Sequence, residues 1–466
     1  MFTSYLPRTL AGALLLAGAA TTQAATLLVT VKADAYDGVC NLHCSLRDAV
    51  AVANQSGTAN TILLPSGTYT LSRLDPLDGD DIPIDEDGNQ TGDLDIPGEL
   101  RIKGAGRGMT TIKGPTDAYL TLNHRLIEVH PNARLVLEDL NLKDGHSAYN
   151  GGAVENHGYL LLRDMRVEEN IARARKPLDD PLDEEASSGR GGAIANYGDL
   201  TVLASHIRFN GAEGFRENNN SGLGGAIYNR GSLRVSDTHF QENYAVDESY
   251  AGSGAAIYSK GLATVERGSF ILNYVDKLSD GGAITNEGGG VLKLTNSTLS
   301  YNSVSALVNG LNDLPGQRSK ATLNNVTITS NDDFGYYAVV NWSDLRIRNS
   351  VIAGNRDLWS GGGGNCINQG SNFSYQAIGL LRNDEESNCN ADYFVPFDQT
   401  FTKVLSARPT EQSNSTWAQV LRPGSPAIDA GIGDCIAKDQ RGVSRPKDGN
   451  GDGVAVCDLG AYELIP

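Results

Sequence analysis

The stretch GGAIANYGDLTVLASHIRFN (191–210) decides the fold, because it returns with small changes as GGAIYNRGSLRVSDTHFQEN (224–243) and GAAIYSKGLATVERGSFILN (254–273). Units of the same kind begin at Gly151 and Gly281, and two degenerate units follow them. In five of the seven units, 17 residues separate the alanine of the opening word from a closing asparagine. This constant spacing indicates that the chain is built from structural repeats.

Each unit contains three short strand-like runs separated by turn residues, and none has the apolar spacing of a helix. A period of roughly 25–40 residues with this content is typical of a β-solenoid, so we predict a parallel β-helix. The glycines are expected where a Cβ would clash in a tight turn. The residue after each alanine is predicted to point inward as one apolar column: Val154, Ile194, Ile227, Ile257, Ile284, Leu307 and Val339. Its neighbour varies and is predicted to point outward: Glu155, Ala195, Tyr228, Tyr258, Thr285, Val308 and Val340.

Two sets of polar residues, nearly all asparagines, recur at fixed places in the units. We interpret them as ladders whose side chains hydrogen-bond along the stack, rather than as glycan sites or ligands. The first set is Asn156, Asn196, Asn229, Ser259, Asn286, Asn309 and Asn341, and the second is Asn170, Asn210, Asn243, Asn273, Asn302, Asn331 and Asn355.

The ends of such a stack need caps, because an open end exposes the core and unpaired strand edges. CSLRDAVAVAN (44–54) predicts a short amphipathic helix with Ser45 as its N-cap and Asp48 completing a capping box. The C-terminal part loses the repeat and is predicted to be a disulfide-stapled cap. The predicted organisation is a signal peptide (1–24), an N-terminal cap with irregular first coils (25–98), β-helix repeats (99–365) and a C-terminal cap module (366–466).

The first 24 residues predict a secretory signal peptide. Arg8 supplies a basic start, an apolar run follows over 10–20, and Thr22–Ala24 is an acceptable cleavage site. No later stretch is long and apolar enough to cross a membrane. We therefore expect an exported protein that is extracellular or held at the cell surface, with the periplasm as an alternative.

In an exported protein the six cysteines are expected to form disulfides, because disulfides persist in oxidising compartments. None has the spacing of a zinc site, and the six allow about 15 connectivities. We favour sequential pairing: Cys40 with Cys44, Cys366 with Cys389, and Cys435 with Cys457.

The formal net charge is −18, and no basic cluster offsets it in the sequence. Nucleic-acid binding depends on neutralising phosphates with Lys and Arg, so we exclude nucleic acid as a partner. The 54 glycines and 7% aromatic residues suit a turn-rich β protein.

The chain resembles bacterial secreted β-helix proteins marked by a Cys-Ser-Leu-Arg-Glu-Ala motif. The resemblance implies a right-handed, pectin-lyase-like parallel β-helix, and the end of the chain is similar to a C-terminal module of the choice-of-anchor kind. Words such as FQEN and FILN are similar to repeats of polymorphic outer-membrane proteins. The matching stretches are CSLRDA (44–49), GTYTL (67–71), GDLDI (92–96), GSPAIDAG (424–431), DQRGVSRP (439–446) and CDLGAYE (457–463).

The same resemblance raises pectate lyases, polygalacturonases and epimerases as comparisons, but fold alone does not settle function. Arg101-Ile102-Lys103 matches one short motif of polygalacturonase-like hydrolases, but the other motifs of that active site do not accompany it. The histidines lack the paired spacing of metal ligands. The acidic pairs are scattered in expected loops: Asp80-Asp81, Asp179-Asp180 and Asp332-Asp333. The sequence yields no catalytic constellation.

DGNGDG (448–453) is similar to the start of a calcium loop. Asp448, Asn450 and Asp452 would supply oxygens, with Asp458 as a further ligand, although the twelfth position is Leu459 instead of Glu. We predict calcium as a cofactor here, and a plain Gly/Asp turn is the alternative.

Tyr228 and Tyr258 occupy equivalent outward positions on adjacent units, and Tyr244 and Tyr274 form a second equivalent pair. Aromatic faces along a rigid solenoid can stack on sugar rings, so Tyr228 and Tyr258 are predicted carbohydrate-binding residues. The alternative is that they pack under the variable insertions, which are themselves candidates for a binding surface.

We therefore predict a non-catalytic interaction module for adhesion or glycan binding, whose partner is a polysaccharide or another cell-envelope component. The alternatives are a polysaccharide lyase or epimerase, and a purely structural spacer. An enzyme requires charged residues that converge on one patch of two or three adjacent coils, whereas a binding module requires only an exposed face.

Overall fold

The computed structural model describes most of the chain. The predicted signal peptide (1–24) lies outside the described residues apart from Ala24. The described ranges are 24–76, 86–115, 124–148, 150–174, 188–214, 221–246, 252–276, 281–303, 305–333, 337–357, 364–369, 374–383 and 387–466.

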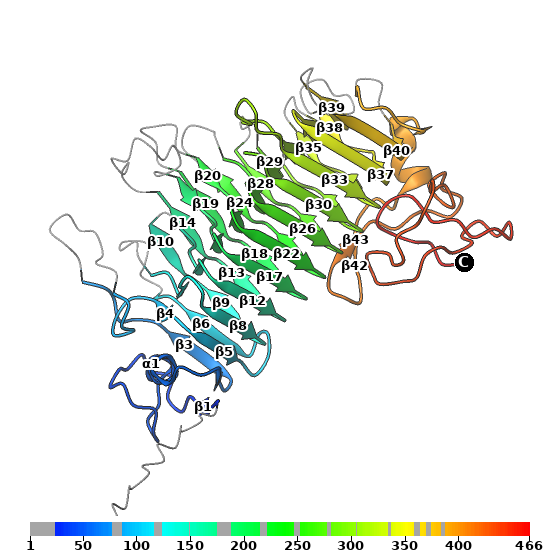
Figure 1. Cartoon of the computed structure of the whole chain (residues 1–466). Coiled ribbons are helices and arrows are strands. Elements are labelled where there is room, and N and C mark those ends of the chain that lie inside the picture. Colours follow the sequence, from blue (N-terminus) through cyan, green and yellow to red (C-terminus); the bar gives the residue numbers. More distant parts are fainter. Residues whose placement is uncertain are drawn as a thin grey trace, which may run out of the picture.

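The chain winds into an elongated stack of coils that runs from the N-terminal cap to the C-terminal segment (Figure 1). Most coils add two strands to the largest parallel sheet and one to a ten-stranded sheet, so strands that are neighbours in space are one coil apart in sequence. This topology confirms the predicted all-β, right-handed parallel β-helix.

The largest sheet has 22 strands and consists of two parallel runs that share the long strands β37 and β40. The first run is β1 (Thr26–Leu28), β2 (Asn60–Leu63), β5 (Glu99–Lys103), β8 (Arg134–Glu138), β12 (Tyr159–Arg163), β17 (Asp199–Leu203), β22 (Ser232–Ser236), β26 (Leu262–Glu266), β30 (Val291–Thr295), β33 (Lys320–Asn324), β37 (Asp344–Ile352) and β40 (Tyr375–Arg382). The second run is β3 (Gly67–Thr70), β6 (Thr110–Lys113), β9 (Asn141–Lys143), β13 (Arg166–Glu168), β18 (His206–Arg208), β23 (His239–Gln241), β27 (Ser269–Ile271), β31 (Thr298–Ser300), β34 (Thr327–Thr329) and β41 (Tyr393–Phe394).

Two further parallel sheets complete the coils, with ten and five strands. The ten-stranded sheet is β4 (Leu94–Ile96), β7 (Ile127–Val129), β11 (Val154–Asn156), β16 (Ile194–Asn196), β21 (Ile227–Asn229), β25 (Ile257–Ser259), β29 (Gly282–Asn286), β32 (Ser305–Asn309), β36 (Val339–Asn341) and β39 (Cys366–Asn368). The five-stranded sheet is β10 (His146–Ala148), β14 (Ile171–Arg173), β19 (Gly211–Glu213), β24 (Tyr244–Val246) and β28 (Tyr274–Val275). Three two-stranded sheets pair β15 (Gly189–Arg190) with β20 (Gly222–Leu223), β35 (Asp332–Asp333) with β38 (Arg356–Asp357), and β42 (Thr410–Glu411) with β43 (Trp417–Ala418).

The predicted inward column forms the apolar core. Ile194, Ile227 and Ile257 are in register on successive coils, and each is fully buried. Phe240 and Phe270 stack in the same core with ring centroids 4.8 Å apart. Because each coil alone cannot bury its apolar residues, stacking supplies the stability, at about 1.5–3 kcal/mol for each large side chain removed from water.

Both asparagine ladders are confirmed. In the first, Asn196 Nδ2 donates to Asn229 Oδ1 at 2.7 Å. In the second, Asn210 Nδ2 donates to Asn243 Oδ1 at 2.9 Å, and the backbone N–H of Asn210 donates to the same oxygen at 3.1 Å. The ladders therefore satisfy polar groups that the stacked turns bury.

The coils bend at two columns of non-glycine residues in the left-handed conformation, a feature that the sequence did not reveal. Such φ values are uncommon outside glycine, asparagine and aspartate. One column precedes the second run and contains Asp139, Asp164, Ala204, Asp237, Arg267, Asn296, Asn325 and Asn349, with φ of 45–57°. The other follows it and contains Asp144, Glu169, Phe209, Glu242, Leu272, Tyr301 and Ser330, with φ of 51–59°. All residues of the second column are at least partly exposed.

The N-terminal helix α1 (Leu46–Ser56) confirms the predicted cap, with Ser45 as N-cap and a complete capping box to Asp48. The sequence did not show that Arg47 is fully buried. Its guanidinium pairs with Asp34 at 2.8 Å and donates to the carbonyl oxygens of Thr91 and Gly92 at 2.9 Å. Arg47 therefore fastens the helix to the first coils.

The C-terminal segment folds back along the stack after the last coils (Figure 1). Strands of the solenoid sheets occur on both sides of the predicted boundaries at 98 and 365, because β1–β4 and β39–β41 belong to them. After β41 come the short helices η2 (Phe397–Gln399) and η3 (Thr400–Val404). The remaining segment lies against the second run, where Thr298 Oγ1 donates to Gln440 Oε1 at 2.6 Å.

The predicted disulfide pairing is confirmed. The bonds are Cys40–Cys44, Cys366–Cys389 and Cys435–Cys457, and no cysteine is free in the described part of the chain. None of the described helices is long and apolar enough to cross a membrane.

Candidate functional site

The prediction that Tyr228 and Tyr258 present open outward faces is wrong. Both side chains point away from the main core, but they are 0% and 2% exposed. Their rings stack on each other with centroids 5.5 Å apart, and they form a small separate cluster with Leu223 of β20. The two tyrosines therefore match the alternative prediction, in which they pack beneath neighbouring segments. A sugar ring cannot reach them in this structure.

The second tyrosine pair has the accessibility that the first lacks. Tyr244 and Tyr274 are in register on β24 and β28, and their rings stack with centroids 5.4 Å apart. Tyr274 is 41% exposed, and Tyr244 lines a pocket. Gly211 of β19 stands beside Tyr244, and a Cβ there would overlap the tyrosine ring, so glycine lets the ring lie across the sheet.

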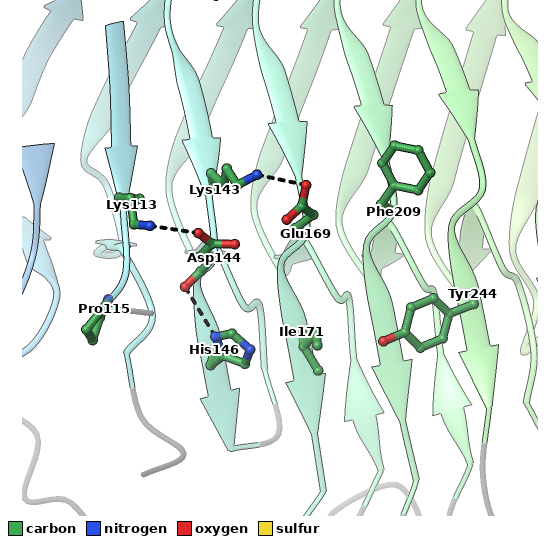
Figure 2. A pocket seen from close by; sticks show the side chains of 9 residues that line it. All are labelled: Lys113, Pro115, Lys143, Asp144, His146, Glu169, Ile171, Phe209 and Tyr244. Carbon is green, nitrogen blue, oxygen red and sulfur yellow. Dashed lines mark hydrogen bonds and ion pairs between the residues drawn. The ribbon is translucent and has the colours of Figure 1, made fainter. Parts of the chain in front are cut away.

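The pocket has a volume of about 540 Å³ and lies at the bend between the second run and the five-stranded sheet (Figure 2). Three of its side chains, Asp144, Glu169 and Phe209, come from the left-handed bend column, which brings them side by side on successive coils. The full lining is Lys113, Pro115, Lys143, Asp144, His146, Glu169, Ile171, Phe209 and Tyr244.

Two ion pairs cross the pocket from strand to strand, as Figure 2 shows. Lys113 Nζ lies 3.0 Å from Asp144, and Lys143 Nζ lies 2.8 Å from Glu169. Burial lowers the pKa of His146, whose Nδ1 donates to the carbonyl oxygen of Asp144 at 3.2 Å, so this imidazole is neutral at pH 7. The pocket thus offers fixed donors and acceptors with little net charge.

A third ion pair holds the Tyr244 side of the pocket in place. Tyr244 Oη donates to Glu213 at 2.9 Å, and Glu213 pairs with Arg173 on the adjacent strand. Burial and the nearby Glu213 carboxylate raise the pKa of Tyr244, so the phenol stays protonated. An aromatic wall beside paired charges can stack on a sugar ring and hydrogen-bond its hydroxyls.

The predicted calcium residues do not form one acidic group. The carboxylate of Asp448 accepts from the backbone N–H groups of Gly451 and Gly453 at 2.8 and 2.9 Å, which describes a tight turn. Among the described residues, the oxygens of Asp448, Asp452 and Asp458 do not gather within 4.8 Å of one another. Asn450 lies in the same turn and accepts from the Asp452 N–H at 2.8 Å. Calcium binding at this loop remains a prediction.

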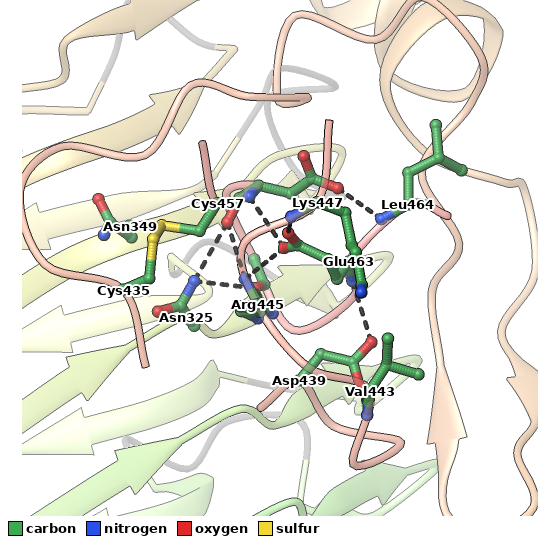
Figure 3. A network of polar contacts seen from close by, with 12 residues as sticks. Asn325, Asn349, Cys435, Asp439, Val443, Arg445, Lys447, Cys457, Glu463 and Leu464 are labelled. Carbon is green, nitrogen blue, oxygen red and sulfur yellow. Dashed lines mark hydrogen bonds and ion pairs between the residues drawn. A yellow bond between two sulfur atoms is a disulfide. The ribbon is translucent and has the colours of Figure 1, made fainter. Parts of the chain in front are cut away.

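Asp458 instead belongs to a buried network that holds the C-terminal segment together, of which Figure 3 labels Arg445, Glu463 and Leu464. Its carboxylate accepts from the N–H groups of Asp429 and Leu464 at 2.8 and 2.6 Å. Arg445 pairs with Glu463 at 3.3 Å, and both side chains are fully buried. Burial raises the pKa of Asp458 to about 6 and that of Glu463 to about 7.

A second polar cluster lies on the outer face of the ten-stranded sheet, and the sequence did not predict it. Asp95, Glu128 and Glu155 occupy equivalent positions on β4, β7 and β11. Arg125 lies among them and pairs with Glu128 and Glu155, and also with Asp93 at 2.6 Å. Aligning LDI (94–96) and IEV (127–129) with VEN (154–156) is the signal that would have found this column.

Two histidines border this cluster. His130 Nε2 lies 3.0 Å from Asp95, and His157 Nε2 lies 3.1 Å from Glu155. The hydrogen bond to Glu155 raises the pKa of His157. Although burial opposes it, the three carboxylates raise the pKa of Arg125 well above its ordinary value, so Arg125 cannot act as a base. Asp87, Asp95 and His130 are the one group in the described chain whose ligand atoms lie close enough to share a metal ion.

The structure describes only some of the other residues that the sequence suggested for catalysis. Arg101 is paired with Glu138 on a different sheet run from the pocket. Of the acidic pairs, Asp332-Asp333 form the short strand β35, and the other two lie outside the described residues. Arg101 and Asp332-Asp333, which the structure does describe, lie on different strands and outside the pocket lining.

No family model matches the chain, and no curated protein matches it. Several solved structures are similar. Pectate lyase Pel9A is 16% identical, with 96% of this chain and 98% of that chain covered and a TM-score of 0.46. The Azotobacter vinelandii mannuronan C-5 epimerase AlgE6 A-module is 12% identical, with 73% and 96% covered and a TM-score of 0.32. The alginate lyase AlyGC is 11% identical, with 90% and 58% covered and a TM-score of 0.34.

Proposed function

We propose that this protein is an exported, non-catalytic β-helix module that binds carbohydrate in the pocket at the bend between the second run and the five-stranded sheet. The observation that carries this proposal is the pairing of the pocket residue Tyr244, against which the exposed Tyr274 stacks, with the ion pairs of Lys113 and Lys143. All these groups project from a rigid stack, so they are positioned before any ligand arrives.

The proposed location is the cell exterior or the cell surface. Three disulfides with no free cysteine in the described residues suit an oxidising compartment. The resemblance to secreted β-helix proteins supports the same location. A polysaccharide or another glycan of the cell envelope is then the partner, and adhesion is the role that we propose.

The proposal is tested by affinity electrophoresis of the purified mature protein in gels that contain single polysaccharides. The wild-type protein is expected to be retarded by at least one polymer, and Tyr274→Ala is expected to lose that retardation. Trp342→Ala serves as a matched control, because Trp342 is a similarly exposed aromatic residue, at 43%, away from the pocket. Equal retardation of all three proteins would contradict the proposed site.

A second candidate function, a polysaccharide lyase or epimerase, is favoured by the cluster on β4, β7 and β11. It places carboxylates and two partly exposed histidines on three adjacent coils, which is the convergence that an enzyme requires. Ultraviolet absorbance of unsaturated sugars tests for a lyase, and incorporation of solvent deuterium at C5 tests for an epimerase. Either signal, if abolished in Glu155→Gln, would replace the non-catalytic proposal.

A further inference from the structure

The outer face of the second run is divided into a covered part and an open part. The C-terminal segment covers the residues that project from β27, β31 and β34, through three hydrogen bonds of 2.6–3.0 Å. In the described chain, its contacts with this column end at His239 of β23, where Trp417 stacks with ring centroids 6.0 Å apart. The same column continues on β18 and β13 as His206 and Arg166.

Two arginines lie near His206 on the open part. Arg166 is half-buried on β13, and Arg107, from the turn between β5 and β6, donates to the carbonyl oxygen of Ala204 at 3.1 Å, two residues before His206. Neither Arg107 nor Arg166 has a carboxylate within 4.0 Å among the described residues. Their neighbour Arg208, in contrast, is paired with Glu168 at 2.7 Å.

The charged side chains that act on His206 are arginines, although the chain carries a formal net charge of −18. Burial and the charges of Arg107, Arg166 and Arg208 lower the pKa of His206 to about 3, so this histidine adds no charge of its own. His206 Nε2 and Arg166 Nε are buried and have no hydrogen-bond partner within the described structure. Both guanidinium groups thus lie near His206 without a carboxylate partner in the described chain, and their forked donors match an oxoanion.

We propose that Arg107 and Arg166 form a subsite for the carboxylate or sulfate group of an acidic polysaccharide that also occupies the pocket. This inference rests on the proposed carbohydrate function and names its substrate class. Glu169 of the pocket is three positions after Arg166, at the bend that follows β13, so the two residues are at most about 10 Å apart along the chain. A polymer that lies along β13 therefore reaches both places.

Affinity electrophoresis with defined polymers tests the subsite. Polygalacturonate and its methyl-esterified form differ in charge on one backbone, and dextran sulfate and dextran separate sulfate from carboxylate recognition. The variants are Arg107→Gln, Arg166→Gln and Arg166→Lys. Arg234→Gln is the matched control, because Arg234 is an exposed arginine on β22, in the first run. Thermal unfolding of each variant checks that the fold is intact.

Each glutamine variant is expected to bind the preferred anionic polymer about tenfold more weakly, since each loses a charge-assisted hydrogen bond. Arg166→Lys keeps the positive charge but loses the forked N–H donors of the guanidinium group, so its loss of affinity is expected to be smaller. The control and the uncharged polymers are expected to show no change. Unchanged binding in both glutamine variants, together with loss in Tyr274→Ala, overturns the subsite alone. A wild-type protein that binds none of the polymers overturns the proposed function and the subsite with it.

Discussion

Two pairs of stacked tyrosines lie 16 residues apart on the same two coils, yet they have opposite environments. Tyr228 and Tyr258 stack at 5.5 Å on the ten-stranded sheet and are buried, whereas Tyr244 and Tyr274 stack at 5.4 Å on the five-stranded sheet beside a pocket. Both pairs follow from the same repeat. What separates them is coverage, because Leu223 and its neighbours pack over the first pair. The direction of a side chain therefore does not establish its accessibility.

The largest expected effect concerns the buried pair. Tyr228→Ala removes a fully buried ring and is expected to destabilise the protein by about 3–5 kcal/mol, while carbohydrate binding by the protein that remains folded is unchanged. Urea unfolding combined with affinity electrophoresis measures both quantities. A stable variant that has lost binding would reverse the roles assigned to the two pairs.

The next effect concerns the asparagine ladder that leads into the pocket strand. Asn243 precedes Tyr244, and its side chain accepts from Asn210 and donates to Asn273 at 3.0 Å. Asn243→Ala leaves buried polar groups without partners and is expected to cost about 1–3 kcal/mol of unfolding free energy. Asn390→Ala, at an exposed asparagine outside the ladder, is the control, and equal stability of the two variants would contradict the ladder's role.

The burial of acidic side chains in the C-terminal segment is expected to make the stability of the protein depend on pH. Glu463 is buried there with a pKa of about 7, above its unfolded value of 4.5. A raised pKa means that the protonated form favours folding, so this contribution is present below pH 4.5 and is lost as the pH rises through 7. Between pH 5 and 8, Tm is expected to fall by a few degrees more in the wild type than in Glu463→Gln. Parallel pH profiles would contradict this assignment.

The smallest effect on stability is expected at the exposed pair. Tyr274→Ala removes a ring that is 41% exposed, so it is expected to change the unfolding free energy by about 1 kcal/mol or less. Its expected consequence is loss of carbohydrate binding. Isothermal titration with the polymer that retards the wild type measures that loss. Tyr228→Ala is expected to show the opposite result, with lower stability and unchanged binding.

Local and periodic features could be predicted from the sequence. The 17-residue spacing identified the coils, the inward column and both ladders. Ser45 and Asp48 identified the helix cap because a capping box is a contact over three residues. The sequential disulfides followed from the grouping of the cysteines and the expected compartment.

The candidate sites could not be predicted because they combine residues from several coils. The pocket combines residues between Lys113 and Tyr244 in the sequence, and the polar cluster on the ten-stranded sheet combines residues between Asp93 and Glu155. The register of the strands that carry them is known only after the irregular first coils are placed. The left-handed bends, which present Glu169 and Phe209, occur at residues that have no conformational signature in sequence.

A crystal structure of the wild-type protein with an acidic oligosaccharide tests the central claim most directly. The account predicts a sugar ring between Tyr244 and the ion pairs of Lys113 and Lys143, with an acidic group directed toward Arg166. A sugar bound instead across Asp95, Glu128 and Glu155 on the ten-stranded sheet would contradict it and would favour the enzyme.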